Sequence, residues 1–313
     1  MPEKTLPHET TTPEAVSTAL KSGDGSKPRS LGQDAWRELR SSWLFWTSGV
    51  LLVLLVLMAV FPTLFTGVDP READLRGHYL SPPNWSHVFE KDWFGYNGQG
   101  QSVYARTVHG ARASITVGVC VTLAVTLFGG LLGMLAGYFG GWIDTLLSRL
   151  TDIFFGIPLL LGGLTLLQAF THRTVWTVTL GLATFGWMQI ARVMRGAVIT
   201  QKEADFVTAA RALGAGTGRI LFRHILPNVI GPVIVVATIA LGGYISTEAT
   251  LSYLGIGLQD PVVSWGVDIA AGQSQLRDAP HVLLIPAGFL SLTVLAFILL
   301  GDAVRDALDP KLR

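Results

Sequence analysis

Residues 203–228 read EADFVTAARALGAGTGRILFRHILPN, a segment with three arginines and three glycines that lies between long apolar runs. The whole chain has 313 residues, of which 50% are hydrophobic and only 14% are charged. Soluble domains carry about 25% charged residues, so this composition indicates a membrane protein. Residues 203–228 are therefore expected to leave the bilayer and to fold in water.

Apolar runs on both sides of this segment predict the membrane spans. A helix needs about 20 mostly apolar residues to cross the hydrocarbon core. Charge-free runs of about this length lie between Arg40 and Asp69, Arg112 and Asp144, Asp152 and Arg173, Arg173 and Arg192, Arg223 and Glu248, and Asp278 and Asp302. We therefore predict an all-α polytopic membrane protein with six transmembrane helices.

The distribution of Lys and Arg predicts the orientation of these spans. Most of the 23 basic residues lie before the first run, between residues 192 and 223, or at the C-terminus. Cytoplasmic loops carry the excess of Lys and Arg. Both termini and residues 203–228 are therefore expected in the cytoplasm.

The spans divide the chain into five expected parts. Residues 1–32 are rich in Thr, Pro, Ser, Gly and charge, so they cannot bury enough apolar surface to become ordered. We expect a disordered cytoplasmic tail there. The other parts are a surface helix with the first transmembrane helix over 33–68, an extracytoplasmic loop over 69–110, a core of five transmembrane helices over 111–304, and a cytoplasmic C-terminal tail over 305–313.

The second span contains glycines at a regular spacing. Gly129, Gly133 and Gly137 are four residues apart in FGGLLGMLAGYFGG and share one helix face. Small residues at this spacing allow two helix backbones to approach closely in a membrane. We predict helix packing at this face, with the lining of a transport path as the alternative.

The sequence contains no motif for catalysis. It has no G-x-x-x-x-G-K-[ST] phosphate loop, and it lacks the H-E-x-x-H and G-x-S-x-G signatures. Its single cysteine, Cys120, excludes a Cys-based zinc site. We expect no catalytic residue, no metal site, no bound cofactor and no nucleic-acid partner for this chain.

Two carboxylates at the ends of apolar runs are candidates for a further role. Glu248, in ISTEATLSYLG, is interpreted as a residue of the headgroup region, with the outer mouth of a transport path as the alternative. Asp152 shares a helix face with Asp144 and Arg149, which favours an interfacial ion pair over a binding site.

The start of the 203–228 segment carries a helix signal. Thr200 and Glu203 match the S/T-x-x-E capping box, which predicts a helix over 201–213 that includes Asp205. Its small residues Ala209 and Ala210 leave room for the close approach of another chain.

The rest of the segment contains stop signals. Gly214 suits the left-handed residue that ends a helix. Thr217 is expected to cap a second short helix, and Pro227 marks the end of that helix or a bend into the fifth span. Arg211, Arg219 and Arg223 give the segment a basic surface. We predict a helix–turn–helix that docks another protein, with an ordinary positive-inside loop as the alternative.

This segment resembles the cytoplasmic loop of ABC importer permeases. The family pattern is Glu-Ala-Ala, three residues, Gly, nine residues, Ile, one residue, Leu-Pro. The matching positions are Ala209, Ala210, Gly214, Leu226 and Pro227, while Thr208 replaces the Glu and His224 replaces the Ile. The stretches YFGGWIDTLLSRLTD, EATLSYLGIGLQDPVVSWG and LLGDAVRDALDPKLR are similar to the dipeptide/oligopeptide/nickel branch, so the resemblance covers residues 100–313.

One stretch departs from that branch. Before the second span the branch usually has Gly-Thr-Asp and then Gly-Arg-Asp, whereas this chain has FGYNGQGQSVYARTVHGAR. Asn97, Gln101 and Ser102 stand at the places of the charged residues. The substitution puts in doubt any ion pair or substrate contact that those charges make in the branch.

The resemblance implies a permease subunit in the bacterial cytoplasmic membrane. It implies a second homologous permease, two cytoplasmic ATPase subunits that use ATP and Mg, and an extracytoplasmic substrate-binding protein. Short peptides are the expected substrate, with nickel or another small solute as the alternative. A secondary transporter should show broken helices with a charged group near the midplane, and we expect neither. A membrane scaffold would not need the capped segment.

Overall fold

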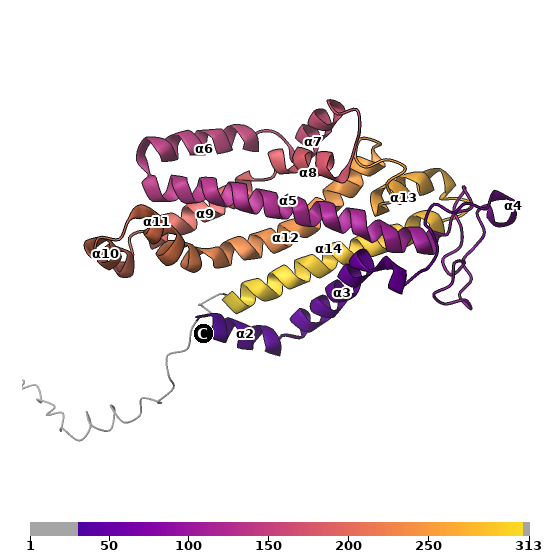
Figure 1. The fold of residues 1–313 in the computed structure, drawn as a ribbon, viewed down its shortest axis with the longest axis horizontal. Helices are drawn as coiled ribbons and strands as arrows, with labels where there is room; N and C mark the ends of the chain where they lie inside the picture. The colour runs from indigo at the N-terminus through magenta and orange to yellow at the C-terminus, as the bar shows by residue number, and fades with distance from the viewer. Residues whose placement is uncertain (1–30, 309–313) are drawn as a thin grey trace, which may run out of the picture.

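The computed structural model describes residues 31–308, and side chains from Trp36 onward. The expected tail over 1–32 lies almost wholly outside the described residues, as do the last five residues of 305–313. The described residues form helices and no strand (Figure 1). The elements are α2 (Leu31–Ser41), α3 (Trp43–Val60), η1 (Pro62–Leu64), α4 (Leu75–His78), α5 (Val103–Phe139), α6 (Gly141–Phe155), α7 (Leu159–Gln168), α8 (Val175–Thr184), α9 (Met188–Gln201), α10 (Asp205–Ala212), α11 (Thr217–Arg219), η2 (Ile220–Ile225), α12 (Leu226–Tyr253), α13 (Trp265–Gly272), η3 (Gln273–Gln275) and α14 (His281–Leu308).

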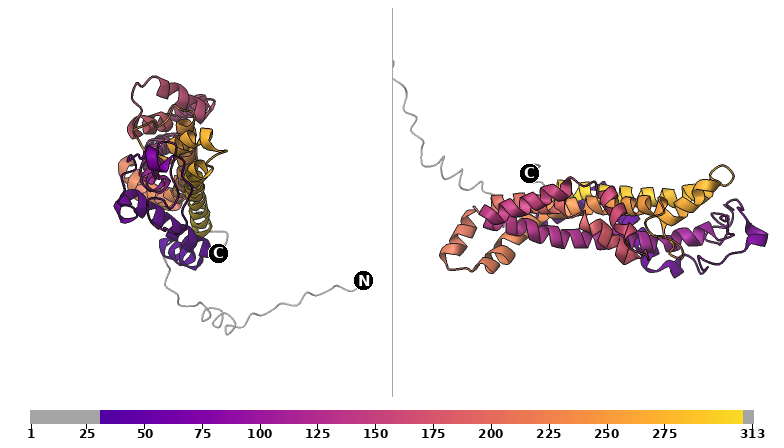
Figure 2. Two further views of the ribbon diagram at one scale, coloured as in Figure 1. Left: turned by 90° about the vertical axis from the view of Figure 1, so that its right-hand side faces the viewer. Right: turned by 90° about the horizontal axis from the view of Figure 1, so that it is seen from above.

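The helices form an elongated bundle. α5 packs against α9 and α12, and α14 packs against α12 and α3. Seen from above, α10 and α11 protrude at one end of the bundle and the segment that contains α4 lies at the other end (Figure 2). The all-α fold that the sequence predicts is therefore present in the described part of the chain.

Within residues 31–308, four helical stretches are long and apolar enough to cross a membrane, namely α3, α5, α14 and the continuous stretch Thr217–Tyr253. The third expected span is instead a bent pair, in which α6 and α7 meet at 81°. Pro158 immediately precedes α7 at this bend, and the residue before a proline is pushed out of the helical conformation. The fourth expected span divides into α8 and α9 around Gly186. Broken helices are thus present where the sequence predicted none.

α5 begins at Val103, inside the segment that was expected to be an extracytoplasmic loop over 69–110. Ser102 caps this helix, because its Oγ accepts a hydrogen bond from the Ala105 N–H at 3.1 Å. Arg106 does not end the helix, since its side chain is buried against Asp268 rather than exposed to water. A charged residue alone is therefore a poor marker of the end of this span.

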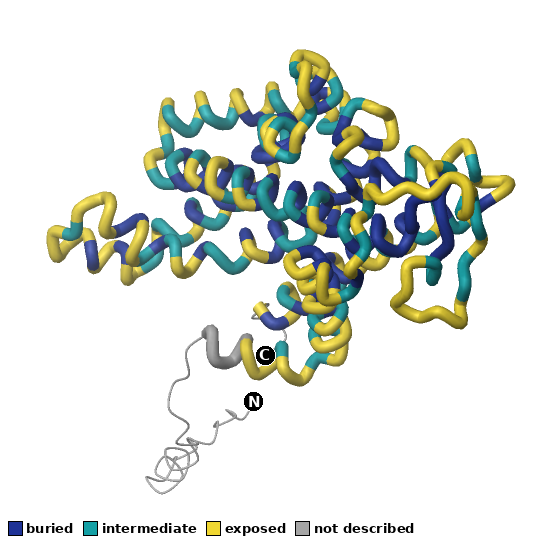
Figure 3. The backbone as a smooth tube through the Cα atoms, turned by 45° about the vertical axis from the view of Figure 1, so that its right-hand side comes forward, coloured by how far each residue is buried: buried dark blue, intermediate teal, exposed yellow. Residues whose placement is uncertain are grey.

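Buried residues run through the centre of the bundle, whereas the α10–α11 end is mostly exposed (Figure 3). One apolar cluster joins α5, α8, α9 and α12 and continues into η2. A second cluster joins α3, α5 and α14 around the fully buried Trp265 of α13.

Gly129, Gly133 and Gly137 of α5 face α9 and are all buried. A Cβ atom on Gly129 would overlap the carbonyl oxygen of Trp187, and one on Gly133 would overlap that of Ala191. A Cβ on Gly137 would lie 2.8 Å from the Arg195 carbonyl oxygen. The two helix backbones are thus in direct contact along this face, the arrangement that small residues four apart permit.

Candidate functional site

The tip of the bundle, residues 205–225, contains α10, a turn, α11 and η2. Its apolar side chains anchor it to the rest of the protein, since Val207 and Ile225 are fully buried and Ile220 is nearly so. These residues belong to the same apolar cluster as Val198 of α9. The tip is therefore a folded part of the bundle.

The turn after α10 is a Schellman motif. The Gly214 N–H donates to the Arg211 carbonyl at 3.0 Å, and the Ala215 N–H donates to the Ala210 carbonyl at 3.0 Å. Gly214 has a φ of 81°, the left-handed conformation that glycine adopts without steric cost. The structure thus places Gly214 at the helix stop that the sequence indicated.

The capping residues predicted for the tip are wrong. Thr200 and Glu203 form no capping box, because Thr200 lies inside α9 and its hydroxyl donates to the Gly196 carbonyl at 3.3 Å. α10 begins at Asp205 after Ala204, which offers no side-chain cap. Thr217 is the first residue of α11 and not its cap, which is Gly216.

The outward face of the tip combines apolar and basic side chains. Leu213 is 89% exposed, and Phe206 and Phe222 are also exposed. Among the residues predicted for docking, those exposed are Asp205, Ala209, Arg211, Gly214, Arg219, Arg223 and Pro227, whereas Ala210 is buried. No ion pair involves the three arginines within the described residues. Exposed apolar side chains among unpaired cations are typical of a surface that binds another protein.

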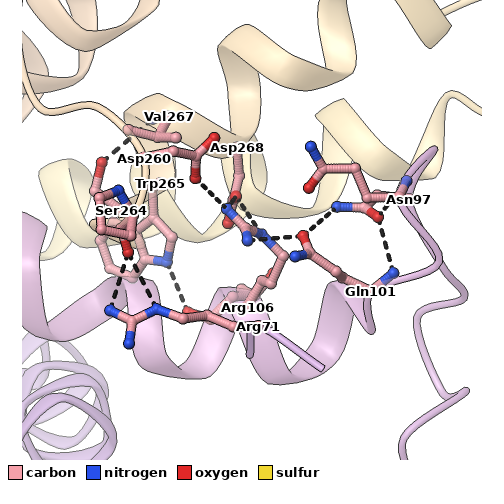
Figure 4. A network of polar contacts seen from close by, with 12 residues as sticks. Arg71, Asn97, Gln101, Arg106, Asp260, Ser264, Trp265, Val267 and Asp268 are labelled. Carbon is pink, nitrogen blue, oxygen red and sulfur yellow. Dashed lines mark hydrogen bonds and ion pairs between the residues drawn. The ribbon is translucent and has the colours of Figure 1, made fainter. Parts of the chain in front are cut away.

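A buried polar network lies at the opposite end of the bundle (Figure 4). Arg106 of α5 donates from Nε to Oδ1 of Asp268 at 2.7 Å, and from Nη1 to Oε1 of Gln101 at 2.8 Å. Arg106 and Asp268 are 5% and 6% exposed. Burial raises the pKa of Asp268, and the Arg106 guanidinium opposes that rise.

Asn97 and Gln101, two of the residues that depart from the branch pattern, belong to this network. Asn97 donates from Nδ2 to Oε1 of Gln101 at 3.0 Å, and its Oδ1 accepts the Gln101 N–H at 2.9 Å. Ser102 caps α5 and also donates to the Lys91 carbonyl. Neutral side chains therefore hold the start of α5 in place beside the charged pair of Arg106 and Asp268.

Glu248 occupies neither of the positions expected for it. Its side chain is fully buried between α12, α5 and the segment before α13. Its Oε1 accepts hydrogen bonds from Ser252 at 2.8 Å and Ser264 at 3.4 Å. Ser114 of α5 accepts the Trp265 N–H nearby at 3.3 Å. Glu248 thus joins three elements inside the protein and does not face headgroups or a path mouth.

Asp144 and Asp152 pair with arginines of α9. Arg195 donates from Nη2 to Oδ2 of Asp144 at 2.7 Å, and Arg192 reaches Asp152 at 3.3 Å. The expected ion pair at Asp152 is therefore present, although its partner is Arg192 and not Arg149.

One cluster in the loop before α5 brings together groups that can bind metals. His87 Nδ1 lies 2.9 Å from Asp92 Oδ2 and 3.6 Å from Glu90 Oε2. Burial raises the pKa of Asp92, but hydrogen bonds from His87 and Asn84 outweigh it and hold the pKa below its usual value. These bonds account for the arrangement of the cluster, which sequence spacing did not indicate.

Comparison with known proteins assigns the chain to a family. Residues 129–313 match the family described as binding-protein-dependent transport system inner membrane component. Residues 30–83 match the N-terminal TM domain of oligopeptide transport permease C. The first match lies within residues 100–313, which carry the resemblance to the ABC importer permeases.

Three relatives cover almost the whole chain. The oligopeptide transport system permease protein OppC of Bacillus subtilis is 36% identical over 94% of this chain and 96% of its own length. The dipeptide transport system permease protein DppC of the same organism is 38% identical over 90% of this chain and 86% of its own length. The glutathione transport system permease protein GsiD of Shigella flexneri is 35% identical over 96% of this chain and 97% of its own length. The chain is therefore a multi-pass membrane protein that belongs to the family of binding-protein-dependent transport system inner membrane components.

Proposed function

We propose that this chain is a permease subunit of an ATP-driven importer of short peptides. The names of its relatives support this substrate class, since they refer to oligopeptides, dipeptides and glutathione. We propose six membrane passages, in which the pair α6–α7 is the third and the pair α8–α9 is the fourth. Both termini and residues 205–225 then lie in the cytoplasm, as the distribution of Lys and Arg favours.

The exposed surface of the tip is the observation that carries this proposal. Leu213 and Phe222 expose large apolar side chains at a protruding end of the molecule, next to Arg219 and Arg223. Burial of these apolar side chains under a partner lowers the free energy of the complex. The partner is a cytoplasmic ATPase subunit with a groove that accepts the apolar side chains and with acidic or carbonyl groups that meet the arginines.

The chemistry of ATP hydrolysis belongs to that partner. ATP and Mg are bound by two ATPase subunits, and this chain, which lacks a phosphate loop, binds no cofactor. When the ATPase subunits close on each other, they move the tip and the helices to which it is anchored. Val207 and Ile225 connect this movement to α9 and α12, because they are buried in the apolar cluster of those helices.

Two further partners complete the proposed machine. A second homologous permease forms the other half of the transport path, and an extracytoplasmic binding protein delivers the substrate. Import of nickel or another small solute by the same machine is the alternative. Secondary transport and a scaffold role are disfavoured by family membership.

Co-purification tests the proposal. The tagged chain is expressed with the ATPase, permease and binding-protein genes that neighbour it, and the recovered subunits are identified by mass spectrometry. The double variant Leu213→Ser, Phe222→Ser should lose the ATPase subunits and keep the second permease. Leu75→Ser is the matched control, since Leu75 is 58% exposed at the other end of the bundle. Equal recovery of ATPase from the tip variant and the control would contradict the proposed contact.

A further inference from the structure

The loop between α4 and α5 brings three possible metal ligands together. His87, Glu90 and Asp92 each contribute one ligand atom, and these three atoms lie within 4.8 Å of one another. Within the described residues, no other His, Cys, Asp or Glu side chains form such a group of three. The sequence alone led us to expect no metal site, because the three residues match no established ligand motif.

The spacing of the three atoms fits a small metal ion. His87 Nδ1 lies 2.9 Å from Asp92 Oδ2 and 3.6 Å from Glu90 Oε2. Zn²⁺ binds imidazole nitrogen and carboxylate oxygen at about 2.0–2.2 Å, so neighbouring ligand atoms of a tetrahedral site are about 3.4 Å apart. The two distances in the loop lie on either side of that value. Small side-chain rotations therefore suffice to place all three atoms around one ion, with water as the fourth ligand.

Hydrogen bonds within the cluster do not serve both carboxylates. The His87 Nδ1 atom carries at most one proton, and Asp92 is the nearer acceptor for it. The Glu90 carboxylate lies beyond hydrogen-bond distance of the ring and accepts no hydrogen bond among the described residues. A cation at the centre of the cluster would attract both carboxylates and bind the lone pair of an unprotonated Nδ1 atom. Asn84 would support such a site, because its Nδ2 donates to Asp92 Oδ2 at 3.1 Å and so orients this ligand.

The backbone of the loop holds the ligands in place. The Asn84 N–H donates to the Asp92 carbonyl at 3.1 Å and closes the loop, and the Glu90 N–H donates to the His87 carbonyl at 3.0 Å. Phe94, two residues after the last ligand, is buried in the apolar cluster of α3, α5 and α14. The loop is thus attached to the bundle, and little ordering is needed when an ion binds.

The ligand types select the class of ion. Ca²⁺ takes six to eight oxygen ligands, and Mg²⁺ requires an octahedral set of oxygens. The loop instead offers two carboxylates and an imidazole, a ligand that suits Zn²⁺, Cu²⁺ and Ni²⁺. Three protein ligands and one water complete the tetrahedral coordination of Zn²⁺.

We infer that residues 84–92 bind a divalent transition-metal ion, with Zn²⁺ as the best fit, through His87, Glu90 and Asp92. The bound ion is a structural part of the loop and fixes its conformation. This site is separate from the proposed function, because it needs neither a transported solute nor a partner subunit.

Metal titration of the full chain tests the site. The chain is purified in detergent with an affinity tag that contains no histidine, freed of metal with EDTA, and titrated with Zn²⁺ in a calorimeter. The parent chain should bind a Zn²⁺ ion that His87→Ala and Glu90→Gln do not bind. His78→Ala is the matched control, since His78 Nδ1 also lies beside a carboxylate, that of Asp74 at 3.1 Å, but belongs to no group of three ligands. This variant should bind Zn²⁺ as the parent does.

Hydrogen exchange of residues 84–93 provides a second measurement. Zn²⁺ should slow exchange there in the parent chain and in His78→Ala, and should leave it unchanged in His87→Ala. Glu90→Gln keeps the shape of the side chain, so its melting temperature without metal should equal that of the parent. Loss of Zn²⁺ binding by this variant then reports on the missing ligand and not on misfolding.

Three outcomes would overturn the inference. A parent chain that binds no Zn²⁺, or that binds it no better than His87→Ala, would remove the site. Unchanged binding by Glu90→Gln would remove the third ligand and with it the proposed coordination. Displacement of Zn²⁺ by an equal concentration of Ca²⁺ or Mg²⁺ would contradict the class of ion.

Discussion

Arg106 of α5 and Asp268 of α13 form a buried ion pair although 162 residues separate them in the sequence. The pair attaches α13 to the start of α5, next to the hydrogen bonds of Asn97 and Gln101 (Figure 4). Oδ2 of Asp268 is buried and has no hydrogen-bond partner among the described residues. The ion pair with Arg106 is therefore the main interaction that compensates for burial of this carboxylate.

Removal of one member of this pair should destabilise the protein strongly. Asp268→Asn leaves the Arg106 guanidinium buried without a full counter-charge, which is expected to cost about 3–5 kcal/mol. The melting temperature of the purified chain should fall clearly. Asp260→Asn is the control, because Asp260 is 67% exposed and lies 3.9 Å from Arg106, so its loss should cost at most about 1 kcal/mol. Similar melting temperatures for the two variants would contradict the role of the buried pair.

Two neighbouring glycines of α5 should respond in opposite directions to alanine. Gly133→Ala places a methyl group against the Ala191 carbonyl oxygen, and such overpacking costs about 1–3 kcal/mol. A Cβ on Gly130 would meet only the Met194 methyl group at 3.6 Å, so Gly130→Ala should stabilise the helix by roughly 0.5–1 kcal/mol. Thermal unfolding of both variants measures the difference. Equal effects would mean that α5 and α9 are not in backbone contact at Gly133.

Glu248 should tolerate an amide better than truncation. Glu248→Gln keeps an oxygen that accepts from Ser252 and Ser264, and its amide nitrogen takes the place of Oε2, which has no partner among the described residues. Stability should therefore stay close to that of the parent chain. Glu248→Ala removes the buried side chain and should cost about 2–5 kcal/mol, as other large-to-small changes do. If the Gln variant were as unstable as the Ala variant, the carboxylate charge itself would be required.

Local patterns predicted what depends on neighbours in the sequence. The spacing of Gly129, Gly133 and Gly137 indicated a close helix contact, and each of the three faces α9 in the structure. Gly214 was recognisable as a helix stop because the left-handed conformation is a property of single residues. The capping box predicted at Thr200 was wrong because the S/T-x-x-E pattern is also purely local. Here it occurs at the end of α9 and not at the start of a helix.

Contacts between residues far apart in the sequence could not be predicted from the sequence alone. Arg106 was taken as a residue of a loop because charges normally end apolar runs, and its partner Asp268 could not be identified without the fold. Glu248 was assigned to the membrane surface for the same reason, although Ser264 and Ser252 enclose it. The breaks at Pro158 and Gly186 were also hidden, because hydropathy measures how apolar a run is and not whether it is one straight helix.

The helix stop at Gly214 should be needed to couple ATP hydrolysis to uptake. Gly214 has a φ of 81° and open space around its Cα, so Gly214→Val introduces backbone strain of about 1–2 kcal/mol and no clash. The strain should change how α10 presents Leu213 and leave membrane insertion intact. The reconstituted transporter should then hydrolyse ATP without matching peptide uptake. Gly218→Val is the matched control, because Gly218 also has open space but no positive φ, and it should transport normally. Normal uptake by the Gly214 variant would exclude this residue from the coupling mechanism.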